Sequence, residues 1–133
     1  MSQIEGGESK KRILAVDDNA IVLSRIESTL CNDYEVVTVN SGARALKYLK
    51  EEKPDLILMD IQMAQKDGIE TLRDIRAMED RKDIPVIMLT GVEDKDCVLE
   101  SAKLGIDDYI LKPFYSYVLL KRISRVLEQQ QQK

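Results

Sequence analysis

Three aspartates directly follow two of the short apolar runs in the sequence. Asp17 and Asp18 come after the run at residues 13–16, and Asp60 comes after the run at residues 56–59. If both runs are strands of a parallel sheet, these side chains lie at its carboxyl edge, where open α/β sheets bind their ligands. Three clustered carboxylates repel one another, and a hard divalent cation such as Mg²⁺, which prefers oxygen ligands, relieves that repulsion. The pattern therefore predicts a metal site.

A hydroxyl group and an ammonium group are expected at the same edge, because Thr90 and Lys112 directly follow two further apolar runs. With a metal bound, a carboxylate can attack phosphorus and form an aspartyl phosphate. Lys112 would neutralise phosphoryl charge, and Thr90 would donate a hydrogen bond to a phosphoryl oxygen. Asp60 ends the third, central strand and is the expected nucleophile. Asp17 and Asp18 are the expected metal-holding pair, with Asp18 as the direct ligand and Asp17 acting through water.

Composition excludes several other chemistries. The 133 residues contain no histidine, which excludes histidine-based acid–base catalysis, histidine-activated nucleophiles and a phosphohistidine carrier. Cys31 and Cys97 cannot build a zinc site alone, and two distant thiols are typical of a reduced, cytoplasmic protein. A net charge of −4 argues against binding to nucleic acid or to a membrane surface. No apolar run reaches the roughly 18 residues that a membrane span requires.

The elements that must position these residues follow from the hydropathy pattern. Five apolar runs do not alternate with polar residues, which indicates strands that are covered on both faces. These runs are residues 13–16, 36–39, 56–59, 86–89 and 109–111. Between them, apolar residues recur at helical spacing. Strand and helix thus alternate five times, which predicts one α/β domain with a parallel sheet.

Local signals set some of the helix limits. Ser41 is a candidate N-cap for the second helix, and Gly105 suits the position after a helix that runs from about Asp94 to Leu104. The last helix fades into a polar end at residues 129–132, which we expect to fray. Asp107 and Asp108 are expected in a solvated loop, since charged residues are mostly exposed.

Taken together, the motifs resemble the receiver domain of two-component response regulators, over residues 11–128. The residues that carry the resemblance are Val16-Asp17-Asp18, Leu58-Met59-Asp60, Asp67-Gly68, Leu89-Thr90-Gly91 and Lys112-Pro113-Phe114. Residues 1–10 are then expected to be a flexible lead, and residues 129–133 a polar tail or the start of a linker. The resemblance implies a flavodoxin-like (βα)5 three-layer sandwich with a five-stranded parallel sheet of order 2-1-3-4-5.

The resemblance also implies roles for individual residues. Asp60 would accept a phosphoryl group from the phosphohistidine of a sensor histidine kinase or of a phosphotransfer protein. Asp18, Asp60 and the backbone carbonyl of Gln62 would bind Mg²⁺. The Lys112-Pro113 peptide bond would be cis, which is cheap only before proline. Such a domain catalyses its own phosphoryl transfer and dephosphorylation and is not an ordinary enzyme.

The switch implied by the resemblance links Thr90 to Tyr109. When the Thr90 hydroxyl is drawn to the phosphoryl group, the aromatic ring at position 109 would move inward. That movement would alter the face formed by the fourth helix, the fifth strand and the fifth helix. The reader of this face would be a downstream protein target or an output domain outside this chain, and a homodimer through the fourth and fifth helices is compatible with it.

The loop after Asp60 departs from the usual pattern. Similar domains usually have proline where Ala64 stands and an apolar residue where Lys66 stands. We expect a looser loop, because proline fixes φ, and a solvated charge at Lys66. Gln62 and Val92 occupy positions that influence the lifetime of the aspartyl phosphate in the family.

Two other readings remain open at this stage. A degenerate receiver that acts only as a protein-binding scaffold would be expected to lack Asp60, Asp18 or Lys112, yet all three are present. A phosphatase with an aspartyl nucleophile would need a second acid two residues after Asp60, where Gln62 stands. Flavin binding in the same fold is a further alternative with less support, because no phosphate-binding loop rich in Ser, Thr or Gly follows the first strand.

Overall fold

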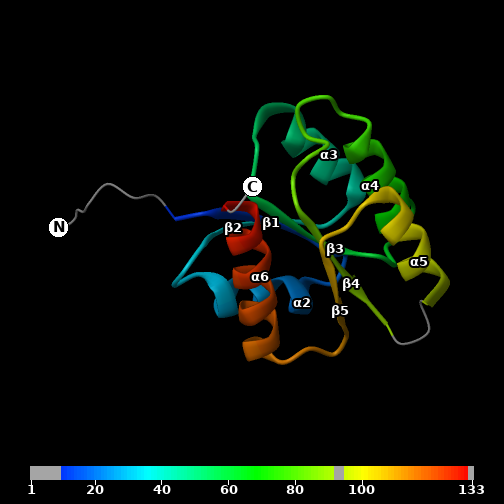
Figure 1. Ribbon diagram of the computed structural model, residues 1–133. Helices are drawn as coiled ribbons and strands as arrows, with labels where there is room; N and C mark the ends of the chain where they lie inside the picture. Colours follow the sequence, from blue (N-terminus) through cyan, green and yellow to red (C-terminus); the bar gives the residue numbers. More distant parts are fainter. Residues whose placement is uncertain (1–9, 92–94, 132–133) are drawn as a thin grey trace.

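A computed structural model describes residues 10–91 and 95–131 of the chain, and strands and helices alternate throughout them (Figure 1). The elements in chain order are β1 (Arg12–Val16), α2 (Ala20–Leu30), β2 (Glu35–Val39), α3 (Gly42–Glu51), β3 (Leu56–Asp60), α4 (Gly68–Arg76), β4 (Val86–Thr90), α5 (Lys95–Leu104), β5 (Asp108–Leu111) and α6 (Ser116–Gln131). Residues 1–9, 92–94 and 132–133, on which some of the expectations above fall, including the one for Val92, lie outside the described residues.

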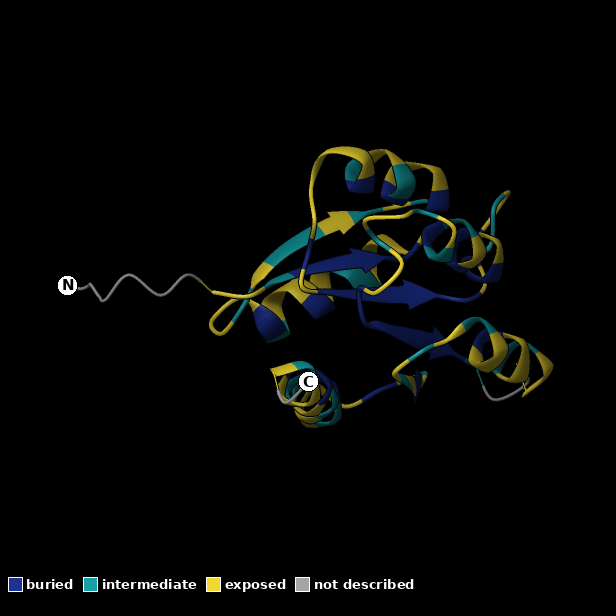
Figure 2. Cartoon of the chain, turned by 45° about the horizontal axis from the view of Figure 1, so that its top comes forward, coloured by how far each residue is buried: buried dark blue, intermediate teal, exposed yellow. Residues whose placement is uncertain are grey.

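The five strands form one parallel sheet in the order β2-β1-β3-β4-β5. In its register, Val16 of β1 lies beside Met59 of β3, and Asp60 lies beside Leu89 of β4. All residues of β3 and β4 are buried, whereas β2, at the edge, is only partly covered (Figure 2). The predicted parallel sheet, its strand order and its central third strand are therefore confirmed.

Helices cover both faces of the sheet, which gives the predicted three layers (Figure 1). Successive residues of a strand point to opposite faces. Ile13 and Ala15 accordingly pack in one hydrophobic cluster with α2 and α6, whereas Leu14 and Val16 pack in a second cluster with α3, α4 and α5. The helices are not equally anchored: α4 has five buried residues, whereas Ser101 is the buried residue of α5.

The helices begin where polar side chains cap their free N–H groups. The Asn19 side chain accepts hydrogen bonds at the start of α2, and Ser41 does so at the start of α3, as predicted. Asp67 and Glu70 form a reciprocal capping box at the start of α4. Gly105 follows α5 with φ of +98°, a left-handed conformation that suits glycine.

The structure differs from the sequence-based expectations at the C-terminal end. The expectation of a solvated loop holds for Asp107, which is exposed and precedes β5, but is wrong for Asp108, which begins β5 with only 9% of its side chain exposed. Arg122 of α6 contacts the Asp108 carboxylate at 2.7 Å and compensates its burial. Helix α6 continues through Gln131, so residues 129–131, expected to be a fraying polar end, are helical. No helix in the described part of the chain is long and apolar enough to cross a membrane.

Candidate functional site

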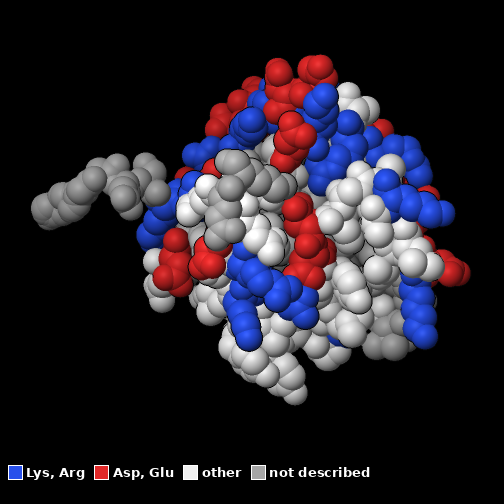
Figure 3. All heavy atoms as spheres, viewed as in Figure 1, with Lys and Arg blue, Asp and Glu red and all other residues white. Residues whose placement is uncertain are grey.

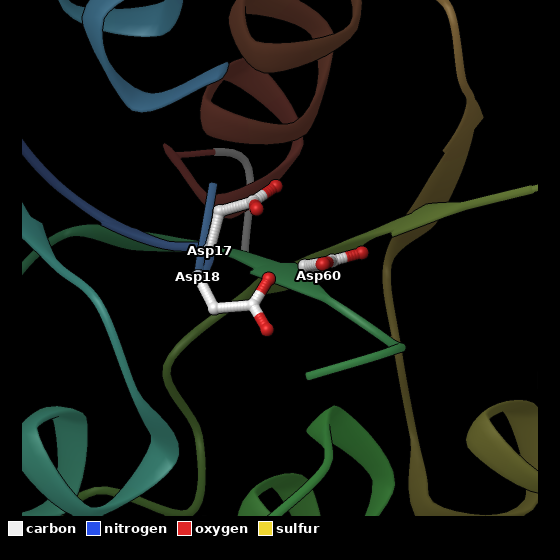
Figure 4. Close-up of side chains that lie close together, drawn as sticks. All are labelled: Asp17, Asp18 and Asp60. Atoms are coloured by element: carbon white, nitrogen blue, oxygen red, sulfur yellow. The ribbon is translucent and has the colours of Figure 1, made fainter. Parts of the chain in front are cut away.

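The three predicted aspartates meet at the carboxyl edge of the sheet, where Asp17 and Asp18 follow β1 and Asp60 ends β3 (Figure 4). Each offers a carboxylate oxygen, and these three oxygens lie within 4.8 Å of one another. Asp17 is fully buried and Asp60 is 6% exposed, whereas Asp18 is exposed to solvent. The cluster is therefore open on the side of Asp18.

Lys112 brings the ammonium group that the sequence placed at this edge. Its Nζ lies 2.8 Å from Asp17 Oδ2 and 3.1 Å from Asp60 Oδ1. The backbone positions it: the Lys112 N–H donates to the Thr90 carbonyl at 2.7 Å, and the Lys112-Pro113 peptide bond is cis. Arg25 of α2 donates a hydrogen bond to the Phe114 carbonyl and lies over the Phe114 ring, a contact that sequence reasoning did not anticipate.

Burial and charge shift the pKa values of the two buried partners. Burial raises the pKa of Asp60 to about 6, the nearby charge of Asp17 adds to the rise, and Lys112 opposes it. Burial acts to lower the pKa of Lys112, but hydrogen bonding to Asp17 and the charge of Asp60 outweigh this effect and raise the pKa. Lys112 therefore stays charged at neutral pH.

Backbone N–H groups hold the two aspartates that follow β1. Asp17 Oδ1 accepts a hydrogen bond from the Asn19 N–H at 2.9 Å, so both of its oxygens have partners once Lys112 is included. Asp18 Oδ2 accepts from the Ala64 N–H at 3.0 Å. That contact comes from the loop between β3 and α4. No residue type signals it in advance, because nearly every residue carries a backbone N–H.

Of the remaining predicted residues, Thr90 and Gln62 lie at or just beyond this edge, and Tyr109 lies within β5. Thr90 ends β4 with a buried side chain, and its hydroxyl donates to the Gly91 carbonyl at 3.2 Å. Tyr109 lies on β5 beside Met88 and is 45% exposed, so its ring is not in the core. Gln62 is exposed two residues after Asp60.

Two residues shortly after Asp60 make contacts that the sequence did not predict. Lys66 was expected to be a solvated charge, but its Nζ lies 2.6 Å from Asp74 of α4. Gly68 begins α4, and a Cβ there would collide with the Asp60 carbonyl oxygen. The backbone of α4 therefore packs directly against the end of β3.

The chemistry of the cluster fits a hard divalent cation. All three candidate ligands are carboxylates, and the exposed Asp18 leaves an approach from solvent. Mg²⁺ is commonly held by one or two carboxylates and keeps several waters. The arrangement can therefore hold Mg²⁺ next to a buried carboxylate and a lysine.

The order of these residues along the chain matches a known family. A model of the response regulator receiver domain matches residues 13–124. The chain belongs to this family. A receiver domain is a module of two-component signalling and not a classical enzyme, and its partners are histidine kinases. An acidic triad such as the one found here is typical of the Mg²⁺ site of receiver domains.

Relatives and solved structures agree with the family. The chain is 35% identical over 125 residues to the transcriptional regulatory protein PrrA of Mycobacterium tuberculosis, which covers 93% of this chain and 53% of PrrA. A CheY-like receiver domain from Methanospirillum hungatei superposes with a TM-score of 0.87 at 31% identity, covering 93% of this chain and 98% of that one. The BeF3-activated DrrB receiver domain superposes with a TM-score of 0.80 at 32% sequence identity, and the match covers 90% of this chain and 99% of that one. The chain spans about half the length of the curated relatives it matches.

Proposed function

We propose that this receiver domain is a phosphorylation-dependent switch of a two-component phosphorelay, in which Asp60 is the phosphoryl acceptor. The donor is the phosphohistidine of a sensor histidine kinase or of a phosphotransfer protein. The observation that supports this best is the Lys112 ammonium group, 3.1 Å from Asp60 within a cluster of three acids. A fixed positive charge beside the acceptor stabilises negative charge that develops on the transferred group.

The transfer requires an ionised acceptor and a compensated charge. A pKa of about 6 leaves Asp60 mostly ionised at neutral pH. Its oxygen forms a bond to phosphorus while the bond from phosphorus to the donor imidazole breaks, and the imidazole nitrogen keeps the electron pair. Lys112 neutralises part of the phosphoryl charge, and the Thr90 hydroxyl turns to donate a hydrogen bond to a phosphoryl oxygen.

Asp18, Asp60 and the Gln62 carbonyl are the proposed ligands of Mg²⁺, with Asp17 acting through water. When bound, this ion supplies positive charge that offsets the three carboxylates and the incoming phosphoryl oxygens. Asp18 is the carboxylate with open access to solvent, which suits an ion that exchanges between turnovers.

The proposed output is a change on the face of α5, β5 and α6, the fourth and fifth helices with the strand between them. Reorientation of Thr90 frees space toward which the exposed Tyr109 ring moves. Phosphorylation acts only through its different interaction free energy with the two states. This face is read by a downstream protein target or by an output domain outside this chain, and it is also the proposed contact of a homodimer.

No nucleic-acid contact is assigned to the domain itself. Its net charge is −4, and acidic and basic side chains are mixed over the face shown in Figure 3. Binding to the phosphate backbone needs a basic surface. The proposed place of action is the cytoplasm, with no contact to the membrane.

The test is the intact mass of the protein after incubation with acetyl phosphate, with Mg²⁺ or with EDTA. The parent protein should gain the mass of one phosphoryl group only with Mg²⁺, and Asp60→Ala should gain none. Asp33→Ala, which removes an exposed aspartate remote from the cluster, is the matched control and should behave as the parent.

Equal labelling of the parent and of Asp60→Ala would show that the acceptor is another residue. If neither acetyl phosphate nor a phosphorylated histidine kinase labels the parent, the domain is a protein-binding scaffold and the proposal fails.

A further inference from the structure

The loop between β3 and α4, residues 61–67, supplies a hydrogen bond to the exposed acid of the cluster. The Ala64 N–H donates to Asp18 Oδ2 at 3.0 Å. Asp17 is held by Lys112, which follows β5, and by the N–H of its neighbour Asn19. Asp18 differs from Asp17 because its hydrogen bond comes from the loop that directly follows Asp60.

Several contacts fix this loop independently of Asp18. Ile61 and Met63 are buried in the core, and the Gly68 N–H closes the loop on the Ile61 carbonyl at 2.8 Å. Lys66 binds Asp74 of α4, and Gln65 adopts a left-handed conformation with φ of +65°. The Ala64 N–H is therefore presented by a loop that is anchored on both sides of it.

We propose that Ala64 is a positioning residue whose backbone N–H holds Asp18 ready to bind the cation. A hydrogen bond to one oxygen fixes the orientation of the carboxylate and leaves its second oxygen for the metal. The inference rests on the proposed function in taking Asp18 as a ligand of Mg²⁺. It adds that in this chain, where similar domains usually have proline, the group at position 64 that holds Asp18 is the backbone N–H.

Two substitutions separate the N–H from the stiffness of the loop. Ala64→Pro removes the N–H and fixes φ, whereas Ala64→Gly keeps the N–H and loosens the backbone. If the hydrogen bond positions Asp18, Ala64→Pro should bind Mg²⁺ at least about tenfold more weakly, as expected for one hydrogen bond to a charged group, and Ala64→Gly should stay within about twofold of the parent. If loop stiffness sets the affinity instead, Ala64→Gly should bind Mg²⁺ more weakly than Ala64→Pro.

The measurement is a titration of the metal-free domain with MgCl₂ at constant ionic strength, followed by backbone amide NMR shifts, which also report whether each variant is folded. Should Ala64→Pro fail to fold, lactic acid in place of Ala64 turns the Met63–Ala64 amide into an ester, which replaces the N–H with an oxygen atom and keeps the side chain. The same weakening is then expected. Parent-like affinity in the ester or in Ala64→Pro would overturn the proposal.

The Mg²⁺ affinity of Asp18→Asn tests the proposed function itself. Asp18→Asn should lose most Mg²⁺ affinity in every background. If the parent protein binds Mg²⁺ but Asp18→Asn binds it equally well, Asp18 is not a ligand, and the inference falls with that part of the proposed function.

Discussion

Asp60 and Asp17 are two buried carboxylates that share one ammonium group, Lys112. With Asp18 beside them, the cluster carries more negative than positive charge. Removing such groups from water without full compensation costs free energy, which is why burial and Asp17 raise the pKa of Asp60. The carboxylate cluster therefore lowers the folding stability of the domain while it keeps Asp60 next to Lys112.

This cost gives a pH-dependent prediction for Asp60→Asn. The pKa of Asp60 is about 6 in the folded protein, above the ordinary value of 3.8. Between these values the folded state binds the proton more tightly, so its contribution to stability is present at low pH and is lost as pH rises through 6. In EDTA at pH 7.5, Asp60→Asn should be more stable than the parent by up to about 3 kcal/mol, as measured by urea unfolding.

The gain should shrink steadily as pH falls through 6 and vanish below about pH 3, because Asp60 is then protonated in both the folded and the unfolded state. The exposed Asp33→Asn, as control, should show no such trend. A gain that is equal at pH 4 and pH 7.5 would contradict the raised pKa.

The ends of the apolar runs predicted which side chains meet at the site, but they did not predict which backbone N–H groups bind those side chains. The end of each apolar run predicted that Asp17, Asp60 and Lys112 would meet, because parallel strands share one carboxyl edge. The Ala64 N–H was missed, since any residue but proline carries one. The burial of Asp108 was missed because its partner, Arg122, comes from a different element.

The junction of β3 and α4 places an element directly against the acceptor. Gly68 is the first residue of α4, and its backbone packs against the Asp60 carbonyl so closely that no Cβ fits. The same residue donates its N–H to Ile61. The start of a helix thus sets the position of the last residue of a strand.

Gly68→Ala should therefore damage both stability and the site. The added methyl group must displace backbone, which cannot rotate away as a side chain can, so we expect a loss of at least about 2 kcal/mol and slower labelling of Asp60 by acetyl phosphate. Urea unfolding and intact mass measure the two effects.

Gly105→Ala separates the effect on stability from the effect on labelling of Asp60. Its cost comes from a left-handed φ, of the order of 1–2 kcal/mol, and lies far from Asp60 in the chain. It should destabilise the domain and leave labelling unchanged at a temperature where the protein is folded. Parallel loss of labelling in both variants would mean that only global stability matters.

The metal site links local charge to the stability of the whole domain. A ligand that binds only the folded state stabilises it, by about 1.4 kcal/mol at ten times its dissociation constant. Mg²⁺ should raise the melting temperature of the parent by about 3–6 °C at such a concentration. Asp18→Asn should show little rise, and NaCl at matched ionic strength is the control. An equal rise with NaCl would indicate general screening and no specific site.

The global arrangement was predicted unevenly. Continuous apolar runs predicted strands with both faces covered, and the two hydrophobic clusters on opposite sides of the sheet agree with this. Hydropathy alone cannot order the strands, because β1, β3 and β4 are almost equally buried. Their order came from the resemblance to receiver domains. The extent of α6 was missed because its polar last turn has no apolar pattern.

The unequal burial of the helices makes the free energy of local opening differ between them. Helix α4 is fixed by five buried residues, whereas α5 has one, Ser101, and its apolar side chains that pack on the sheet, such as Val98 and Leu104, are only partly buried. Local opening costs least where few apolar contacts are lost. Low-energy excursions of the native state therefore concentrate in α5, next to β5 and Tyr109. This part of the fold can take a second arrangement while the rest of the core stays intact.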